Sequence, residues 1–200
     1  MDRNPLYGDY VEPSVSSSIN ATNALISHIR SLPFPHTVEP VLTPRFALSC
    51  SRPLLLKLGE IARADSSLRI QTHISENQEE IQQTLKAFPE ATSYTDVYDK
   101  HGLVGPRTIF AHAVHLDENE IALLKEKDAG VSHCPTSNFN LRSGVCPVGK
   151  LIDHGIKVID FSWFTNVLLN NLGRRHRSAW ARMSPAVSLH LSSLRSNTLL

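Results

Sequence analysis

Short apolar runs alternate with longer segments of helical spacing from residue 40 to residue 158. In the longer segments apolar residues recur every three to four positions, which is the spacing of one face of an α-helix. Ser51 and Asp117 indicate helix starts, because both side chains can accept hydrogen bonds from free backbone N–H groups. The pattern predicts strands at 41–43, 70–74, 108–111, 130–133 and 155–158, and helices at 20–31, 51–64, 76–88 and 117–128.

A strand, a polar loop and a helix, repeated with short connections, predict parallel strands in an α/β fold. Both a barrel and a doubly wound sheet satisfy this pattern. Residues capable of chemistry follow four predicted strands at their carboxyl ends, namely Arg45, His73, His112 and His133. Their positions favour the barrel, because those ends meet at the mouth where barrel active sites lie. Five strands cannot close an eight-stranded barrel, so we expect a partial (β/α)8 TIM-like barrel with about five of eight βα units.

The charge distribution divides the chain after residue 160. Residues 161–200 contain five arginines and no lysine, aspartate or glutamate, which leaves a net charge of −4 for residues 1–160. We therefore expect an incomplete barrel at 1–160 and a divergent, poorly ordered basic tail at 161–200. The basic cluster at 174–177 has no interleaved aromatic residue, so we expect no nucleic-acid partner.

The remaining composition favours a soluble intracellular protein. A hydrophobic content of 41% in 200 residues is enough to bury a core. The chain has no run of eighteen apolar residues and no apolar signal segment at its start, so we expect a cytoplasmic protein without membrane contact. Cys50, Cys134 and Cys146 are widely spaced, and we expect them to be free thiols in a reducing compartment.

Histidines at the ends of neighbouring strands are candidates for a metal site. His73 ends one predicted strand, and Glu76 follows at the start of the next predicted helix. Imidazole is a common zinc ligand, and a carboxylate beside the metal can receive and return a proton. His112 ends the following strand and would face the same mouth, whereas His115 lies in the loop. The alternative is structural: strand-end or capping histidines, and a glutamate that interacts with a helix dipole.

Two further segments supply polar and aromatic groups. His133 precedes Cys134, Pro135 and a polar loop, which is either a substrate-facing loop or an ordinary turn. The residue order and the missing second cysteine exclude a cytidine-type deaminase. Arg45 and Phe46 offer planar paired donors and a stacking face, which suit a flat heteroaromatic substrate. The alternative is a surface arginine beside a core phenylalanine.

Together these motifs resemble the guanine deaminase branch of the metal-dependent amidohydrolases. The resemblance covers about residues 1–158, and the PRF and THISEN elements separate guanine deaminases from chlorohydrolases and other deaminases. The matching elements, in family order and spacing, are VLTPRFALSCS at 41–51, THISEN at 72–77, YTDVYDK at 94–100, AHA at 111–113 and HCPTSN at 133–138.

The resemblance implies a zinc-dependent hydrolase that converts guanine to xanthine and ammonia in purine catabolism. It implies that His73 is a zinc ligand, that Glu76 is the proton shuttle, and that His112 binds the attacking water or the tetrahedral centre. Arg45 would recognise the carbonyl edge of the purine, with Phe46 alongside. Guanine would then be the small-molecule partner, and a related amidohydrolase acting on another aminated heterocycle stays an alternative.

The sequence departs from the family pattern at both ends. The enzymes that this chain resembles form a complete barrel whose first strand carries a His-x-His pair. None of the ten histidines here forms that pair. After Val158 the family continues to an aspartate ligand, but Trp163 stands at that position, and we interpret Asp160 as a coincidental carboxylate. We expect the first strands to be missing, and we hypothesise that residues 159–200 arise from a retained intron or a shifted reading frame.

His73 is then the one zinc ligand that the resemblance identifies, whereas catalytic zinc sites use about three protein ligands and a water. We therefore expect negligible deaminase activity from the isolated chain. Three interpretations stay open. The chain is an incomplete enzyme, or a non-catalytic partner that binds or forms a homodimer through the barrel surface, or a product that does not fold stably. The last follows because half a barrel exposes strand edges.

Overall fold

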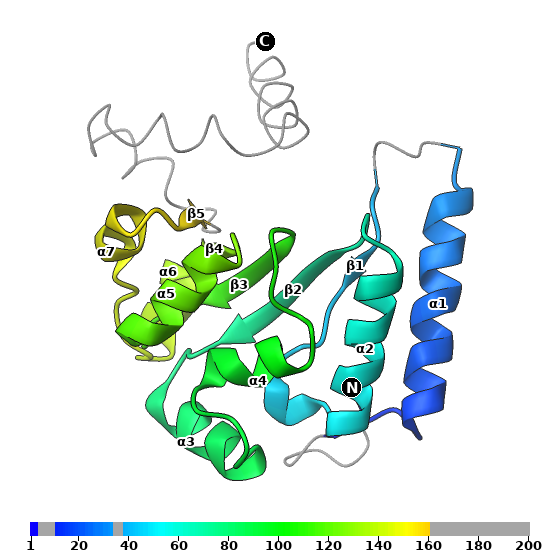
Figure 1. The fold of residues 1–200 in the computed structure, drawn as a ribbon, viewed down its shortest axis with the longest axis horizontal. Coiled ribbons are helices and arrows are strands. Elements are labelled where there is room, and N and C mark those ends of the chain that lie inside the picture. Colours follow the sequence, from blue (N-terminus) through cyan, green and yellow to red (C-terminus); the bar gives the residue numbers. More distant parts are fainter. Residues whose placement is uncertain (4–10, 34–37, 161–200) are drawn as a thin grey trace.

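The computed structural model describes residues 1–3, 11–33 and 38–160. Its centre is a five-stranded parallel sheet in which the strands lie in sequence order (Figure 1). A doubly wound sheet reverses its strand order at a switch point, so this uninterrupted order matches a barrel segment. The predicted α/β class and partial barrel are confirmed. The strands are β1 (Val41–Leu42), β2 (Arg69–Ile74), β3 (Thr108–His112), β4 (Gly130–His133) and β5 (Lys157–Asp160).

Helices connect the strands and pack along the sheet. Helix α1 packs against α2 on the β1 side, and α7 packs against β5 on the other side (Figure 1). Among the described residues, no helix has the length and hydropathy needed to span a bilayer. The helices are α1 (Val15–Ser31), α2 (Arg52–Ala64), α3 (Gln78–Ala87), α4 (Tyr94–Lys100), α5 (Glu118–Glu126), α6 (Pro135–Asn140) and α7 (Val148–Asp153), with a 3-10 turn η1 (Ala47–Ser49).

Helix caps form where the sequence predicts them. The Ser51 side chain accepts a hydrogen bond from the backbone N–H of Leu54 at 3.3 Å, and α2 begins at the next residue. Asp117 accepts from the N–H of Glu120 at 2.8 Å, and the Glu120 carboxylate accepts from the N–H of Asp117 at 3.1 Å. This reciprocal pair is a capping box, which fixes the start of α5.

Several element boundaries differ from the sequence prediction. Helix α1 begins at Val15, earlier than predicted, because the Ser14 side chain caps it. The last strand was predicted at 155–158 but runs from Lys157 to Asp160, since Gly155 has a left-handed φ of 75° that a strand does not adopt. Helices α4, α6 and α7 were not predicted, because with seven, six and six residues they are too short to show a periodic pattern.

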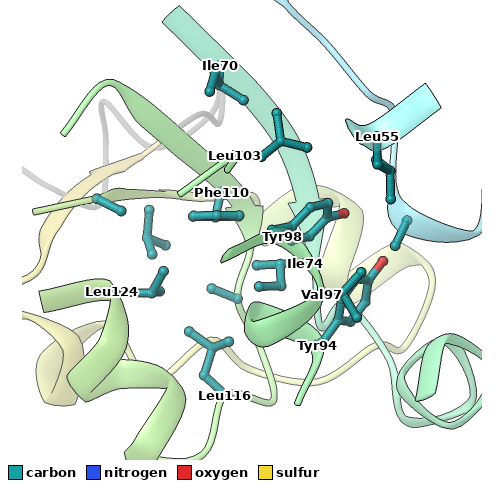
Figure 2. Packing of buried hydrophobic residues seen from close by; sticks show 14 of the residues in the cluster. Leu55, Ile70, Ile74, Tyr94, Val97, Tyr98, Leu103, Phe110, Leu116 and Leu124 are labelled. Carbon is teal, nitrogen blue, oxygen red and sulfur yellow. The ribbon is translucent and has the colours of Figure 1, made fainter. Parts of the chain in front are cut away.

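The main core lies on the face of the sheet that the helices cover (Figure 2). From the sheet, Ile70, Ile74 and Phe110 point into it, each at most 7% exposed. The helices add buried side chains that include Leu55, Tyr98 and Leu124. Along β2 these inward residues alternate with exposed Gln71 and half-buried His73 on the opposite face. That opposite face would line the interior of a closed barrel, and it carries His73.

Candidate functional site

The carboxyl ends of β2 and β3 bring His73, Glu76 and His112 together. The rings of His73 and His112 stack with centroids 5.1 Å apart and an interplanar angle of 27°. Glu76 Oε1 lies 3.5 Å from His112 Nδ1. The strand register explains the proximity, because Ile74 at the end of β2 pairs with His112 at the end of β3. Three of the predicted site residues therefore form one cluster.

Backbone groups fix the orientation of His73. Its Nδ1 lies 2.6 Å from the carbonyl oxygen of Arg45, which also accepts from the His73 backbone N–H at 3.1 Å. A carbonyl oxygen only accepts hydrogen bonds, so Nδ1 carries the proton and Nε2 keeps its lone pair. Burial lowers the pKa of His73, although the hydrogen bond to Arg45 opposes this effect. The hydrogen bond selects the tautomer and burial favours the neutral ring, so Nε2 is available to bind a metal ion.

Glu76 lies before helix α3, not in its first turn. Asn77 caps α3, and the first-turn acids are Glu79 and Glu80, so the predicted helix start at residue 76 was wrong. The Glu80 carboxylate instead accepts from the backbone N–H of Glu76 at 3.1 Å. Glu76 therefore does not act as a first-turn acid that interacts with the dipole of α3, because it precedes the helix and its carboxylate faces His112.

The loop that contains Ser143 also contacts Glu76. The Ser143 hydroxyl donates to Glu76 Oε1 at 3.4 Å, and His115 Nε2 lies 2.7 Å from the carbonyl oxygen of Ser143. The neighbouring Gly144 has a φ of 124°, and a Cβ there would lie 2.9 Å from the Val114 side chain. Glycine therefore allows the close approach that returns Ser143 to the site.

His112 occupies a buried and conformationally unusual position. Its side chain is buried, and Nδ1 lies 2.7 Å from Asn138 Oδ1. The backbone at His112 and Ala113 is left-handed, with φ of 74° and 50°. Non-glycine residues seldom adopt this conformation, and such outliers gather at functional sites.

Arg45 joins the cluster through its backbone. Its carbonyl holds His73, while the exposed guanidinium lies 5.4 Å from the centroid of the Phe46 ring. Phe46 is only partly buried and thus does not belong to the closed core. The cation and the aromatic ring therefore belong to the segment whose backbone holds His73.

The segment after β4 differs from the expected polar loop. His133 ends β4 beside Asp160 of β5, and the following residues form helix α6. Pro135 at the first position favours a helix start, because its fixed φ suits the first turn. The helix carries Asn138 to His112, a contact that sequence reasoning missed. The HCPTSN motif contains Asn138, but nothing in its spacing indicates the partner.

The described residues do not make a complete zinc site. About three protein ligands are needed, and no three His, Cys, Asp or Glu side chains converge suitably in the described part of the chain. His73 fits as one ligand through Nε2. Trp163, at the expected position of a further ligand, and the predicted tail at 161–200 lie outside the described residues.

Comparison with known proteins identifies the family. The Amidohydrolase family model matches residues 7–165. The chain belongs to the amidohydrolase family. Its amidohydrolase relatives include a probable guanine deaminase of Schizosaccharomyces pombe, 51% identical over 150 residues, and a guanine deaminase of Mus musculus, 39% identical over 158 residues. The alignments cover 74% and 79% of this chain but 28% and 34% of those relatives.

A solved amidohydrolase structure agrees with this assignment. The guanine deaminase from C. acetobutylicum, with bound guanine in its active site, matches with a TM-score of 0.74 and 38% sequence identity. The match covers 80% of this chain and 37% of that chain. The predicted resemblance to guanine deaminases is confirmed, and the chain spans roughly a third of the length of the relatives it matches.

Proposed function

We propose that this chain carries part of the active site of a zinc-dependent guanine deaminase, which hydrolyses guanine to xanthine and ammonia in purine catabolism. The cluster of His73, Glu76 and His112 at adjacent strand ends supports this proposal most directly. Relatives named as guanine deaminases support the choice of substrate. Since the chain spans roughly a third of their length, the proposal concerns the complete catalytic unit, and we expect the isolated chain to be inactive.

The chain's own residues supply proton transfer and hydrogen bonding in this proposal. His73 would hold zinc through Nε2 as one of several ligands, and the metal would supply a bound water with a pKa of about 7. Glu76 takes a proton from the attacking water and returns it to the departing amine. His112 binds the water or the tetrahedral centre. The 3.5 Å separation between Glu76 Oε1 and His112 Nδ1 supports this division, because both groups can then reach one reacting centre.

Arg45 and Phe46 provide substrate recognition in the proposal. The Phe46 ring offers a stacking face to a flat base, and the exposed guanidinium offers paired donors to a purine carbonyl. The Arg45 carbonyl also holds His73, so the loop that would bind the base is joined to the proposed metal ligand. Movement of this loop would therefore disturb both functions.

A grafting experiment tests the proposal. Residues 7–158 replace the matching segment of the Schizosaccharomyces pombe relative, and conversion of guanine to xanthine is followed by ultraviolet absorbance. We expect the chimera to deaminate guanine, and Glu76→Gln to lower kcat about 100-fold or more. Glu79→Gln, an exposed acid on α3, is the matched control and should leave kcat unchanged. A folded, zinc-loaded chimera that deaminates an aminated triazine but not guanine would contradict the substrate assignment.

A further inference from the structure

Asn138 is a buried polar residue that contacts the site and has no role in the proposed reaction. It lies in α6 and is 1% exposed, and its Oδ1 is 2.7 Å from His112 Nδ1. The backbone of α6 holds it firmly, because the Asn138 N–H donates to Cys134 at 3.0 Å and its carbonyl accepts from Ser143 at 2.8 Å. The side chain therefore reaches His112 from a fixed position.

The surroundings of His112 Nδ1 determine where the ring proton lies. Asn138 Oδ1 at 2.7 Å and Glu76 Oε1 at 3.5 Å are both hydrogen-bond acceptors. A neutral imidazole has one N–H, which lies on the nitrogen that faces acceptors. His112 therefore carries its proton on Nδ1, and Nε2 keeps a lone pair. The carboxylate oxygen of Glu76 can only accept, so its approach supports Nδ1–H independently of the amide orientation, and Asn138 then presents Oδ1 to that proton.

The neighbouring ring shows the same arrangement. His73 Nδ1 faces the Arg45 carbonyl at 2.6 Å, and its ring stacks on that of His112 at 5.1 Å. Two imidazoles thus use neutral oxygen acceptors to hold the same tautomer. One acceptor is a backbone carbonyl, which no substitution removes, and the other is the Asn138 side chain. The nearer of the two acceptors at His112 Nδ1 is therefore a replaceable side chain, and Glu76 Oε1 at 3.5 Å is the more distant one.

We propose that Asn138 is a positioning residue that fixes His112 in the Nδ1–H tautomer, so that Nε2 accepts a hydrogen bond from the attacking water. The catalytic consequence rests on the proposed deaminase function, whereas the tautomer follows from the contacts alone. The residue acts through His112 and does not touch the substrate. Partners that orient metal-binding histidines contribute about 10- to 100-fold to activity, and we expect an effect of similar size for a histidine that binds the attacking water.

Nitrogen-15 NMR of labelled histidine tests the tautomer directly. The full chain is measured at about pH 9, where imidazole is neutral, and the His112 signals are assigned by their loss in His112→Gln. We expect wild-type His112 to show a protonated Nδ1 and an unprotonated Nε2. Asn138→Leu should raise the population of the Nε2–H form, because only the more distant acceptor Glu76 Oε1 then faces Nδ1. Asn138→Asp keeps an acceptor and should retain Nδ1–H, and Asn140→Leu, an exposed position on α6, is the matched control.

The outcomes separate the two proposals. A wild-type His112 protonated on Nε2, or lacking a single folded-state signal, overturns the positioning role without any variant. The same follows if folded Asn138→Leu keeps the wild-type tautomer. In the grafted enzyme we expect Asn138→Leu to lower kcat about 10- to 100-fold with little change in KM, and Asn138→Asp to restore part of it. If the NMR results hold but the grafted enzyme leaves guanine unchanged, the proposed function fails and the tautomer assignment stands.

Discussion

Left-handed backbone at single residues is concentrated where the site is built. Ser75, His112 and Ala113 have φ of 48°, 74° and 50°, and they directly follow or end β2 and β3. Each such residue costs about 1 kcal/mol relative to the ordinary regions. Hydrogen bonds between the two strand ends hold the segment, including Ala113 N–H to Ile74 at 3.0 Å and Val114 N–H to Ser75 at 3.2 Å. The same turns that carry this strain direct Glu76 and His112 toward each other.

Gly59 lies where α2 crosses the end of α4, and a backbone atom limits the space there. A Cβ at Gly59 would lie 1.8 Å from the carbonyl oxygen of His101, which cannot rotate away. Alanine is the better helix former by about 1 kcal/mol, but overpacking against backbone costs more. We expect Gly59→Ala to lower the free energy of unfolding by about 1 to 3 kcal/mol in urea titrations.

Gly149 in α7 is the matched control for this change. No atom lies within 4 Å of a Cβ built at Gly149, so only helix propensity acts there. Gly149→Ala should raise the free energy of unfolding by up to about 1 kcal/mol. If both variants raised the free energy of unfolding, the contact with the His101 carbonyl would not limit the side chain at residue 59.

At the scale of elements, the carboxylate of Glu120 connects two helices. Besides closing the capping box of α5, its Oε1 accepts from the N–H and the hydroxyl of Thr95 at 3.0 Å each. Thr95 lies in the first turn of α4, so one buried carboxylate satisfies free backbone groups at the start of both helices. The packing of α4 against α5 thereby has a polar anchor as well as an apolar face.

Arg52 connects α2 to the end of α3, and this connection depends on pH. Its guanidinium donates to both oxygens of Glu90 at 2.8 and 3.0 Å, and this hydrogen bond lowers the pKa of Glu90 to about 2. A carboxyl group with a lowered pKa stabilises the fold above its unfolded value of about 4.3 and loses this contribution as pH falls toward 2. We expect the urea midpoints of wild type and Arg52→Gln to differ most at about pH 5. This difference should shrink as the pH falls to about 2.5.

Lys57→Gln on the same helix controls for a general loss of positive charge, because Lys57 pairs with exposed Glu60 at 2.7 Å. Its midpoint difference from wild type should change less over the same range. Arg52 also lies over the Phe88 ring at 5.1 Å, a contact that pH does not alter. A midpoint difference for Arg52→Gln that stays constant down to the acid limit would assign the whole contribution of Arg52 to that stacking contact.

The sequence predicts elements better than it predicts contacts between them. Long helices such as α2 and α5 follow from apolar periodicity and a capping residue, both of which are local. Helix α4 was missed, because it is short and its buried Tyr98 is explained only by contacts with β2 and β3 that are distant in the sequence. Likewise His73 and His112 were predicted from their strand ends, whereas the contact of Asn138 with His112 joins residues 26 positions apart through the path of α6. The catalytic roles of these residues stay predictions.

At the scale of the whole molecule, the described helices pack on the face of the sheet that carries Ile70, Ile74 and Phe110. Parallel sheets normally bury both faces, and in barrels the inner face is buried by the remaining strands. Within the described residues β1 and β5 each pair with a single neighbouring strand. His73, on the inner face, therefore lies where further strands of a closed barrel would supply additional ligands.

This arrangement predicts how the isolated chain behaves with zinc and guanine. His73 is a single suitably oriented ligand, and the described residues form no three-ligand cluster, so zinc should be lost during gel filtration. Without the metal, we expect xanthine to form no faster than in protein-free buffer. Metal content of the eluted protein and ultraviolet absorbance measure the two effects, and we expect the chimera run in parallel to convert guanine. Stoichiometric zinc with chelator-sensitive guanine conversion would mean that ligands outside the described residues complete the site within this chain.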